Sequence, residues 1–241
     1  MKKLFTFLII ILFIGITVPS ATAVENEIVV ITETTHRNFD GLFRDDLLAQ
    51  SLAPTGRLGE LIYVPIKTNR IWVIDPALVD EVTAMTNKYS LVNKTPGVGS
   101  DIALSWITQL RYVTSRNQVI ALAYGNPDIK LAKRLAPSEL KMYFSYGNES
   151  LSKNLIRLVS TRPSFTPTKT VSRLNNSQRI SYTKNRQRLT ELSRVVEDVE
   201  LKALRAKLAI LLSPSLNREN RNYFSLQAIK AVKNEVGKLS V

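Results

Sequence analysis

Two stretches of this chain run from an apolar strand into a turn with Asp and Pro, and then into a helix-forming segment. The first is RIWVID, residues 70–75, followed by Pro76; the second is QVIALA, residues 118–123, followed by YGNPD, residues 124–128. A continuous apolar run is typical of a strand buried on both faces of a parallel sheet. Proline behind an Asp cap predicts a helix that begins at residue 76. Strands separated by helices imply crossover connections, so we expect an α/β fold with a parallel-stranded sheet.

Other segments extend this alternation of strands and helices. The run EIVVIT predicts a first strand at 27–32, and spaced apolar residues predict two short helices between residues 42 and 62. A helix is expected to begin at Ser100 or Asp101, and another at Pro137.

The tripeptide Tyr-Gly-Asn occurs at 124–126 and again at 146–148. The first copy follows a strand. For the second copy we expect Gly147 to end the helix that begins at Pro137, as a left-handed cap. On this interpretation the shared tripeptide has no structural meaning.

Composition divides the chain into an α/β domain at 24–160, a basic polar loop at 161–188 and C-terminal helices at 189–241. The middle segment is rich in Thr, Ser and Asn and has no apolar periodicity. After it, apolar residues at helical spacing predict helices that pack on the α/β domain.

The N-terminus has the pattern of a secretory signal peptide at 1–23. Lys2 and Lys3 precede an apolar run, and Ala21-Thr22-Ala23 forms a small-x-small cleavage site before Val24. An uncleaved anchor is the alternative, although the run is short of the roughly 20 residues that a bilayer requires. We therefore expect export across the cytoplasmic membrane, to a secreted or envelope-associated location.

Two residue types limit the chemistry. The chain has no cysteine, so disulfides and thiolate metal sites are excluded. Its single histidine, His36, lies in a polar stretch, and catalytic zinc sites generally take more than one imidazole. No metal and no cofactor are expected.

The net charge is +13, and among the residues of the mature chain the whole excess of positive charge lies in the C-terminal part. Residues 24–150 carry 13 Lys/Arg and 14 Asp/Glu, whereas residues 151–241 carry 18 and 6. Residues 151–190 contain no carboxylate at all. Such a segment favours an anionic partner.

Candidate contacts for that partner are the basic side chains Arg157, Arg162, Lys169, Arg173, Arg179, Lys184, Arg186 and Arg188. For an exported protein, anionic wall polymers and lipid headgroups are the available polyanions, so nucleic acid is not expected. The alternative is a solvated basic loop with no specific partner.

The order of several motifs resembles the central α/β domain of an uncharacterised family of secreted actinobacterial cell-envelope proteins. These motifs are GRLGELI, IWVIDPALVDEV, SWITQL, VIALAYGNPDIKLAKRL and LRAKLAILLSPSL, spread over roughly residues 55–240. Ile74 to Leu78 and Trp106 match the family pattern, whereas Ala123 and Asn126 stand where the family has Pro and Asp.

The resemblance implies a partial (β/α)-barrel-like sheet, distantly similar to polysaccharide deacetylases and related glycoside hydrolases, with a C-terminal helical segment. It also implies a location in the cell envelope. Those deacetylases hold a metal with Asp and a His-x-x-x-His pair, and this chain has no such pair. The metal-dependent reaction is therefore excluded.

Ligands of parallel α/β sheets bind at the carboxyl ends of the strands, where Asp75 and the turn at 124–128 are expected. The catalytic candidates are Asp75 and Asp128, which could act as acid and base in glycoside chemistry. The ligand-binding candidates are Tyr124, Asn126 and Trp72. The alternative for both carboxylates is helix capping, which stabilises a helix by about 1 kcal/mol without any ligand.

Two functions follow. The first is a non-catalytic envelope protein that binds an envelope glycan, an anionic wall polymer or a partner protein. The second is a metal-independent carbohydrate-active enzyme that uses Asp75 and Asp128. Carboxylates that face an open cleft would favour the enzyme, whereas carboxylates bonded to the amides of the next helix would favour the binding protein.

Overall fold

The computed structural model of this chain describes residues 27–65, 69–161, 183–190 and 198–239. The expected signal peptide at 1–23 lies outside these residues, as do four basic candidates of the expected loop, Arg162, Lys169, Arg173 and Arg179. No helix within the described ranges is long and apolar enough to cross a membrane.

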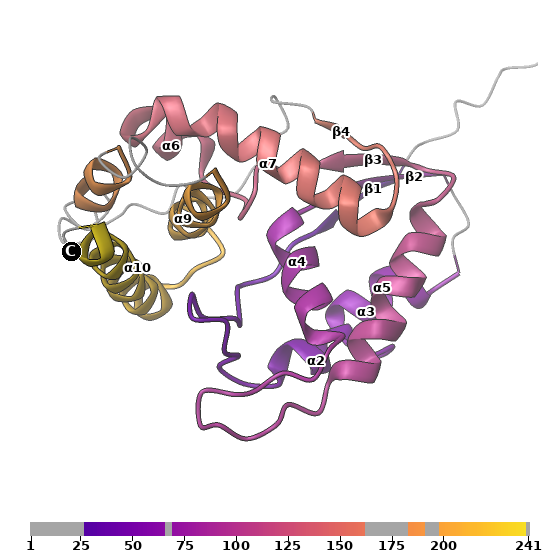
Figure 1. Cartoon of the computed structure of the whole chain (residues 1–241). Coiled ribbons are helices and arrows are strands. Elements are labelled where there is room, and N and C mark those ends of the chain that lie inside the picture. The colour runs from indigo at the N-terminus through magenta and orange to yellow at the C-terminus, as the bar shows by residue number, and fades with distance from the viewer. Residues whose placement is uncertain (1–26, 66–68, 162–182, 191–197, 240–241) are drawn as a thin grey trace, which may run out of the picture.

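The fold is α/β with an open parallel sheet, as the strand-to-helix junctions predict (Figure 1). The strands are β1 (Glu27–Ile31), β2 (Arg70–Ile74), β3 (Gln118–Ala121) and the short β4 (Ser160–Thr161), and they lie side by side in chain order. Ile31 pairs with Ile74, and Ile74 pairs with Ala121, so the carboxyl ends of β1, β2 and β3 are level at one edge of the sheet.

Helices follow each of the first three strands. Their bounds are α2 (Leu47–Leu52), α3 (Arg57–Tyr63), α4 (Pro76–Met85), α5 (Ser100–Thr114), α6 (Ile129–Leu135) and α7 (Pro137–Leu155), with α9 (Asp198–Leu211) and α10 (Arg218–Leu239) in the C-terminal part. Residues 183–190 are also helical, so the basic segment expected as a loop up to residue 188 is helical from residue 183. The expected start of α4 at Pro76, behind the cap Asp75, is confirmed.

One hydrophobic core lies between the sheet and the helices α2 to α5. Trp72 and Ile74 of β2 point into this core, and both are fully buried. Val73 points to the other face of the sheet, where it packs with Ile120 and Leu122, and it is also fully buried. Burial of β2 on both faces is the reason that its sequence is apolar without alternation.

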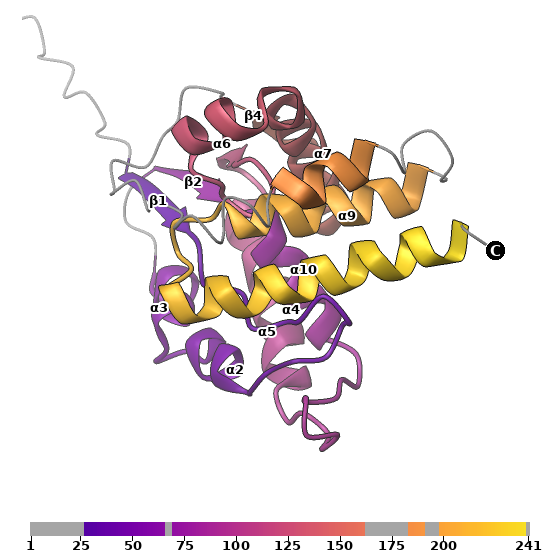
Figure 2. The ribbon, with the colours of Figure 1, turned by 90° about the vertical axis from the view of Figure 1, so that its left-hand side faces the viewer.

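A second core lies between α6, the helix at 183–190, α9, α10 and the first half of α7. Tyr143, Leu208, Leu212 and Phe224 are among its most buried side chains. Figure 2 shows α9 and α10 running side by side in this part of the molecule. The helix α7 belongs to both cores, because Leu140 and Tyr143 pack in the second core and Leu151 and Leu155 in the first.

The expectation that Gly147 ends a helix is wrong. The helix α7 continues through this position and ends at Leu155, and its C-cap Ile156 adopts the left-handed conformation with φ 55°. A Cβ atom on residue 147 would lie 2.6 Å from the carbonyl oxygen of Leu122 and 3.0 Å from the amide nitrogen of Tyr124. Glycine is needed here for the close approach of α7 to the end of β3. From the sequence alone, a glycine that allows close packing cannot be distinguished from a glycine that ends a helix.

Candidate functional site

The carboxyl edge of the sheet is the place where the expected site residues meet. There, β2 ends at Asp75, β3 leads into the turn at Tyr124, and the segment after β1, residues 33–41, crosses from the sheet towards α9 and α10. We call residues 33–41 the strap. The helix α9 covers this edge, since Ile210 packs within 3.0 Å of where a Cβ atom on Gly125 would lie.

Asp75 is a buried structural carboxylate at this edge. Its Oδ1 accepts hydrogen bonds from the amides of Ala77, at 2.9 Å, and Gly125, at 3.1 Å, so it caps α4 and also holds the turn after β3. Burial raises the pKa of Asp75 to about 7, although these two amide donors act in the opposite direction. Asp75 therefore joins two strand ends through its own side chain.

Asp128 is a second helix cap. Its Oδ1 accepts from the amide of Leu131 at 3.0 Å at the start of α6, and its own amide donates to the carbonyl of Leu212 at 2.8 Å. Both catalytic candidates are thus bonded to the amides of the helix that follows them. By the criterion set out above, this arrangement favours a binding protein over an enzyme that uses this pair.

Of the three ligand-binding candidates, two are used by the fold. Trp72 is fully buried in the first core, with the guanidinium of Arg70 5.5 Å from its ring centroid, so it offers no surface to a ligand. Asn126 adopts φ 43° in a tight turn, in which its amide donates to the carbonyl of Ala123 at 2.8 Å. A β-branched or bulky residue would be strained in that conformation, and Asn tolerates it.

Tyr124, the third candidate, lines a cavity of about 230 Å³ between the strap, α4, α7 and α9. Polar side chains predominate on the walls that α4 and the strap provide: Asp80, Glu81, Thr35, Arg37 and Asn38. Tyr146 comes from α7, and α9 adds Ala203, Ala206, Lys207 and Ile210. We call this cavity the edge pocket.

The two Tyr-Gly-Asn tripeptides meet in the edge pocket. The rings of Tyr124 and Tyr146 have centroids 4.5 Å apart, and the amide of Tyr124 donates to the carbonyl of Tyr143 at 3.0 Å. Gly147 allows this contact, because a Cβ atom there would strike the backbone at Leu122 and Tyr124. The shared tripeptide, which the sequence suggested to be without meaning, thus marks two segments in direct contact.

Asp80 fixes the hydroxyl side of this aromatic pair. Its Oδ1 accepts from the hydroxyl of Ser150 at 2.6 Å and from the amide of Asn154 at 2.5 Å, both on α7, and Tyr124 donates its hydroxyl to the same carboxylate. Burial and the negative charge of Asp80 raise the pKa of Tyr124 well above its ordinary value. Tyr124 is therefore a neutral hydrogen-bonding side chain under physiological conditions.

Glu81 holds the strap against α4. Its Oε1 accepts from the amide of His36 at 2.6 Å, and its Oε2 accepts from the hydroxyl of Thr35 at 3.1 Å. Only 6% of Glu81 is exposed, and burial raises its pKa to about 7, against the opposing influence of His36. The carboxylate therefore connects a loop at one side of the edge pocket to the helix at the other.

Asn38 connects the strap to α10. Its Nδ2 donates to the hydroxyl of Tyr223 at 2.9 Å, whereas its Oδ1 is buried and has no hydrogen-bond partner among the described residues. Only 4% of the residue is exposed. An acceptor that is buried without a partner costs about 1–3 kcal/mol, and such atoms are expected where a ligand or water completes the bonding.

The sequence did not suggest Thr35, Asn38, Asp80, Glu81 or Tyr146 for this site. A signal was present for Glu81, which lies between Leu78 and Val82 on the buried side of α4. A carboxylate on an apolar helical stripe is rarely buried without a partner. Thr35 and Asn38 of the strap carry no comparable signal, because their side-chain partners lie far along the chain, on α4 and α10.

The described members of the basic candidate set do not line the edge pocket. Arg157 donates to the carbonyls of Thr114 and Leu158 near the end of α7, and Arg186 donates to the carbonyl of Leu135 at 2.9 Å. Lys184 and Arg188 are exposed. Within the described ranges, no cluster of three or more His, Asp or Glu side chains is suited to hold a metal ion.

Comparison with known proteins adds no relative. No protein-family model matches the chain. No curated protein matches it either. The resemblance to secreted envelope proteins therefore stays a prediction.

Proposed function

We propose that this chain is an exported, non-catalytic protein of the cell envelope that binds a sugar unit of an envelope glycan in the edge pocket. The observation that carries the proposal is the pairing of Tyr124 with Tyr146 beside buried polar groups at the carboxyl edge of a parallel sheet. Ligands of open α/β sheets bind at this edge. Pockets with aromatic walls and a few fixed polar groups are typical of small-ligand sites.

The polar walls suit a ligand with many hydroxyl groups. Asn38 provides an acceptor on the wall of the pocket, because its Oδ1 is buried and without a partner among the described residues. Sugar hydroxyls donate to such acceptors, while the apolar face of a sugar ring can pack on an aromatic ring. Tyr146 is only half-buried, so its ring is the accessible part of the aromatic pair.

A binding role is favoured over the enzyme alternative by the hydrogen bonds of the carboxylates. Asp75 and Asp128 cap α4 and α6, and Asp80 and Glu81 accept hydrogen bonds from α7 and from the strap. A general acid or base needs a lone pair or proton directed at the substrate. In this chain these carboxylates are engaged in holding the walls of the pocket.

The test is a titration of the mature chain with soluble fragments of cell-envelope glycan, followed by calorimetry. Tyr146→Ala removes the accessible ring, and we expect it to weaken binding by roughly two- to tenfold, the equivalent of the 0.5–1.5 kcal/mol that an aromatic contact contributes beyond burial. Tyr112→Ala is the matched control, because Tyr112 is 75% exposed on α5 and outside the edge pocket.

Two results would contradict the proposal. The first is equal binding by the parent chain and the Tyr146→Ala variant, which would place the ligand elsewhere. The second is release of new reducing ends from the glycan during the titration, which would show hydrolysis and therefore an enzyme.

A further inference from the structure

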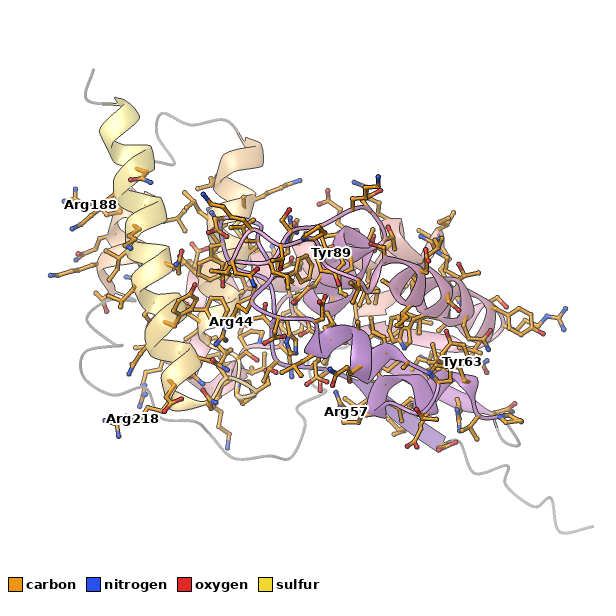
Figure 3. All side chains as sticks on the ribbon, turned by 90° about the horizontal axis from the view of Figure 1, so that it is seen from below. Arg44, Arg57, Tyr63, Tyr89, Arg188 and Arg218 are labelled. Atoms are coloured by element: carbon orange, nitrogen blue, oxygen red, sulfur yellow. The ribbon has the colours of Figure 1, made fainter. Side chains whose placement is uncertain are left out.

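Eight exposed Lys and Arg side chains of the described chain lie on three helical segments of the second core. Residues 129–135, 183–190 and 218–234 contain ten Lys/Arg residues and a single carboxylate, that of Glu219. Figure 3 shows Arg188 and Arg218 pointing outward at the same end of the molecule, away from Tyr63 on α3. We call this surface the basic end.

Two of the ten basic side chains donate hydrogen bonds to backbone carbonyl oxygens and are not part of the exposed charge. Arg186 donates to the carbonyl of Leu135, and so attaches the helix at 183–190 to the end of α6. Arg221 is 2% exposed and donates to the carbonyl oxygens of Leu211, Ser213 and Leu216 where α9 ends. Arg186 thus joins the helix at 183–190 to α6, and Arg221 joins α10 to the segment that connects it to α9.

The other eight side chains are exposed: Lys130, Lys133, Arg134, Lys184, Arg188, Arg218, Lys230 and Lys233. Lys202 and Arg205 of α9 form salt bridges with Glu149 and Glu139 of α7. Glu219 and Glu235 are the carboxylates of α10, and the segments at 129–135 and 183–190 have none.

We propose that the basic end binds a flexible polyanion with phosphodiester-linked units, of the kind found in bacterial envelopes. Repeated phosphates are matched by Lys and Arg side chains through electrostatic attraction and release of counterions. The eight side chains come from three segments, so a chain molecule can contact them in succession. This inference goes beyond the sugar site and does not depend on it.

A lipid bilayer is the other surface with dense phosphate, and the side chains of the basic end disfavour it. Helices that lie on membranes combine basic residues with Trp, Phe or Leu that enter the acyl region. On the three segments, the exposed large apolar side chain is Leu226 of α10, at 62% exposure. A surface of this composition attracts phosphate groups, but its segments lack a set of large apolar side chains that could insert into a membrane.

The test uses the mature chain and poly(glycerol phosphate) as the probe, with binding measured by microscale thermophoresis between 50 and 200 mM salt. The triple variant Lys130→Gln, Lys133→Gln, Arg134→Gln removes three exposed charges of α6. We expect its affinity to fall roughly 10- to 100-fold at low salt. The slope of log K against log salt should decrease by about 2 to 3, since each phosphate contact contributes roughly 0.7–0.9 to that slope.

The matched control is Lys88→Gln, Lys94→Gln, Arg116→Gln, which removes the same charge from exposed positions outside the three segments. It should change the affinity by less than about twofold, because salt at this ionic strength screens the attraction between charges that lie more than about 10 Å apart. Thermal melts of both variants check that each is folded. Tyr146→Ala should leave polymer binding unchanged, which separates this site from the edge pocket.

Three results would overturn the proposal. Equal losses in the two triple variants would mean that only net charge matters. Absence of polymer binding at 50 mM salt would mean that the basic end has no polyanion partner. Tighter binding to vesicles containing anionic phosphatidylglycerol than to the polymer would identify a membrane-facing surface instead.

Discussion

Tyr124 and Tyr146 pack with their ring centroids 4.5 Å apart, although one follows a strand and the other lies within a long helix. Their contact fixes the position of α7 over the carboxyl edge of the sheet and gives the edge pocket its aromatic wall. Gly147, the neighbour of Tyr146, permits the approach, so the geometry of the pocket depends on a residue that has no side chain.

Replacement of Gly147 by Ala should therefore destabilise the protein. Ala favours a helix interior over Gly by about 1 kcal/mol, but its Cβ atom would meet the carbonyl oxygen of Leu122 at 2.6 Å. We expect the overpacking to dominate, with a net loss of about 1–3 kcal/mol in the free energy of unfolding. Urea unfolding measures this loss. Ser145→Ala, at an exposed position of the same helix, should change stability by less than about 0.5 kcal/mol and is the control.

The stability of the protein should fall as the pH rises towards neutrality, because of two buried carboxyl groups. Burial raises the pKa values of Asp75 and Glu81 to about 7. In the unfolded chain these groups lose their protons near pH 4. Between about pH 4 and pH 7 the folded state therefore holds more protons, so the free energy of unfolding decreases over that range and levels off above it.

Glu81→Gln tests this effect of pH, since the amide cannot titrate. The difference in unfolding free energy between Glu81→Gln and the parent chain should depend on pH from about 4 to 7 and be constant above about 7. Carboxyl groups without a charge interaction with Glu81 cancel in the difference. The charge of Glu81 also raises the pKa of Asp75, so its removal adds to the dependence on pH. A difference that stays constant over the whole range would contradict the raised pKa of Glu81.

Tyr223→Phe should loosen the attachment of the strap to α10. The hydroxyl of Tyr223 accepts the hydrogen bond from Nδ2 of Asn38, and its loss leaves the buried amide of Asn38 with no partner among the described residues. We expect a loss of about 1–3 kcal/mol in stability and faster amide hydrogen exchange in α10. Tyr112→Phe, on the exposed side of α5, is the control and should leave exchange in α10 unchanged.

Arg221→Met should destabilise the second core strongly. The buried guanidinium donates to three carbonyl oxygens at the end of α9, and methionine would leave all of them without these donors. A loss of about 3 kcal/mol or more is expected from the unsatisfied acceptors. Arg218→Met, one turn earlier and exposed, should be close to neutral in the same thermal melts. Similar melting temperatures for the two variants would contradict this role of Arg221.

The strand-to-helix junctions were predictable from the sequence because their determinants are local. The run before Asp75, the Asp cap and Pro76 all act within a few residues, and β2 and α4 begin at the expected residues, Arg70 and Pro76. The same holds for the parallel sheet, since crossovers follow from the alternation of elements. The capping alternative for Asp75 and Asp128 could be stated for the same reason.

The edge pocket was less predictable because its walls come from segments that are distant in the chain. Tyr124 was identified by its position after β3. Glu81, Asn38 and Tyr146 enter the pocket through packing of α4, the strap and α7, and no local pattern encodes that packing. Trp72 was named as a ligand-binding candidate, but a large apolar side chain in a central strand serves the core first.

The helix α7 has a consequence for the division of the chain at residue 160. A fragment that ends there would keep the whole of α7 but lose α9 and α10, and Leu140 and Tyr143 would be left facing water together with Leu131 of α6. Such a fragment would carry an apolar surface liable to association. The α/β part and the C-terminal helices should therefore unfold as a single cooperative unit, and a truncated chain would be a poor substitute for the whole protein.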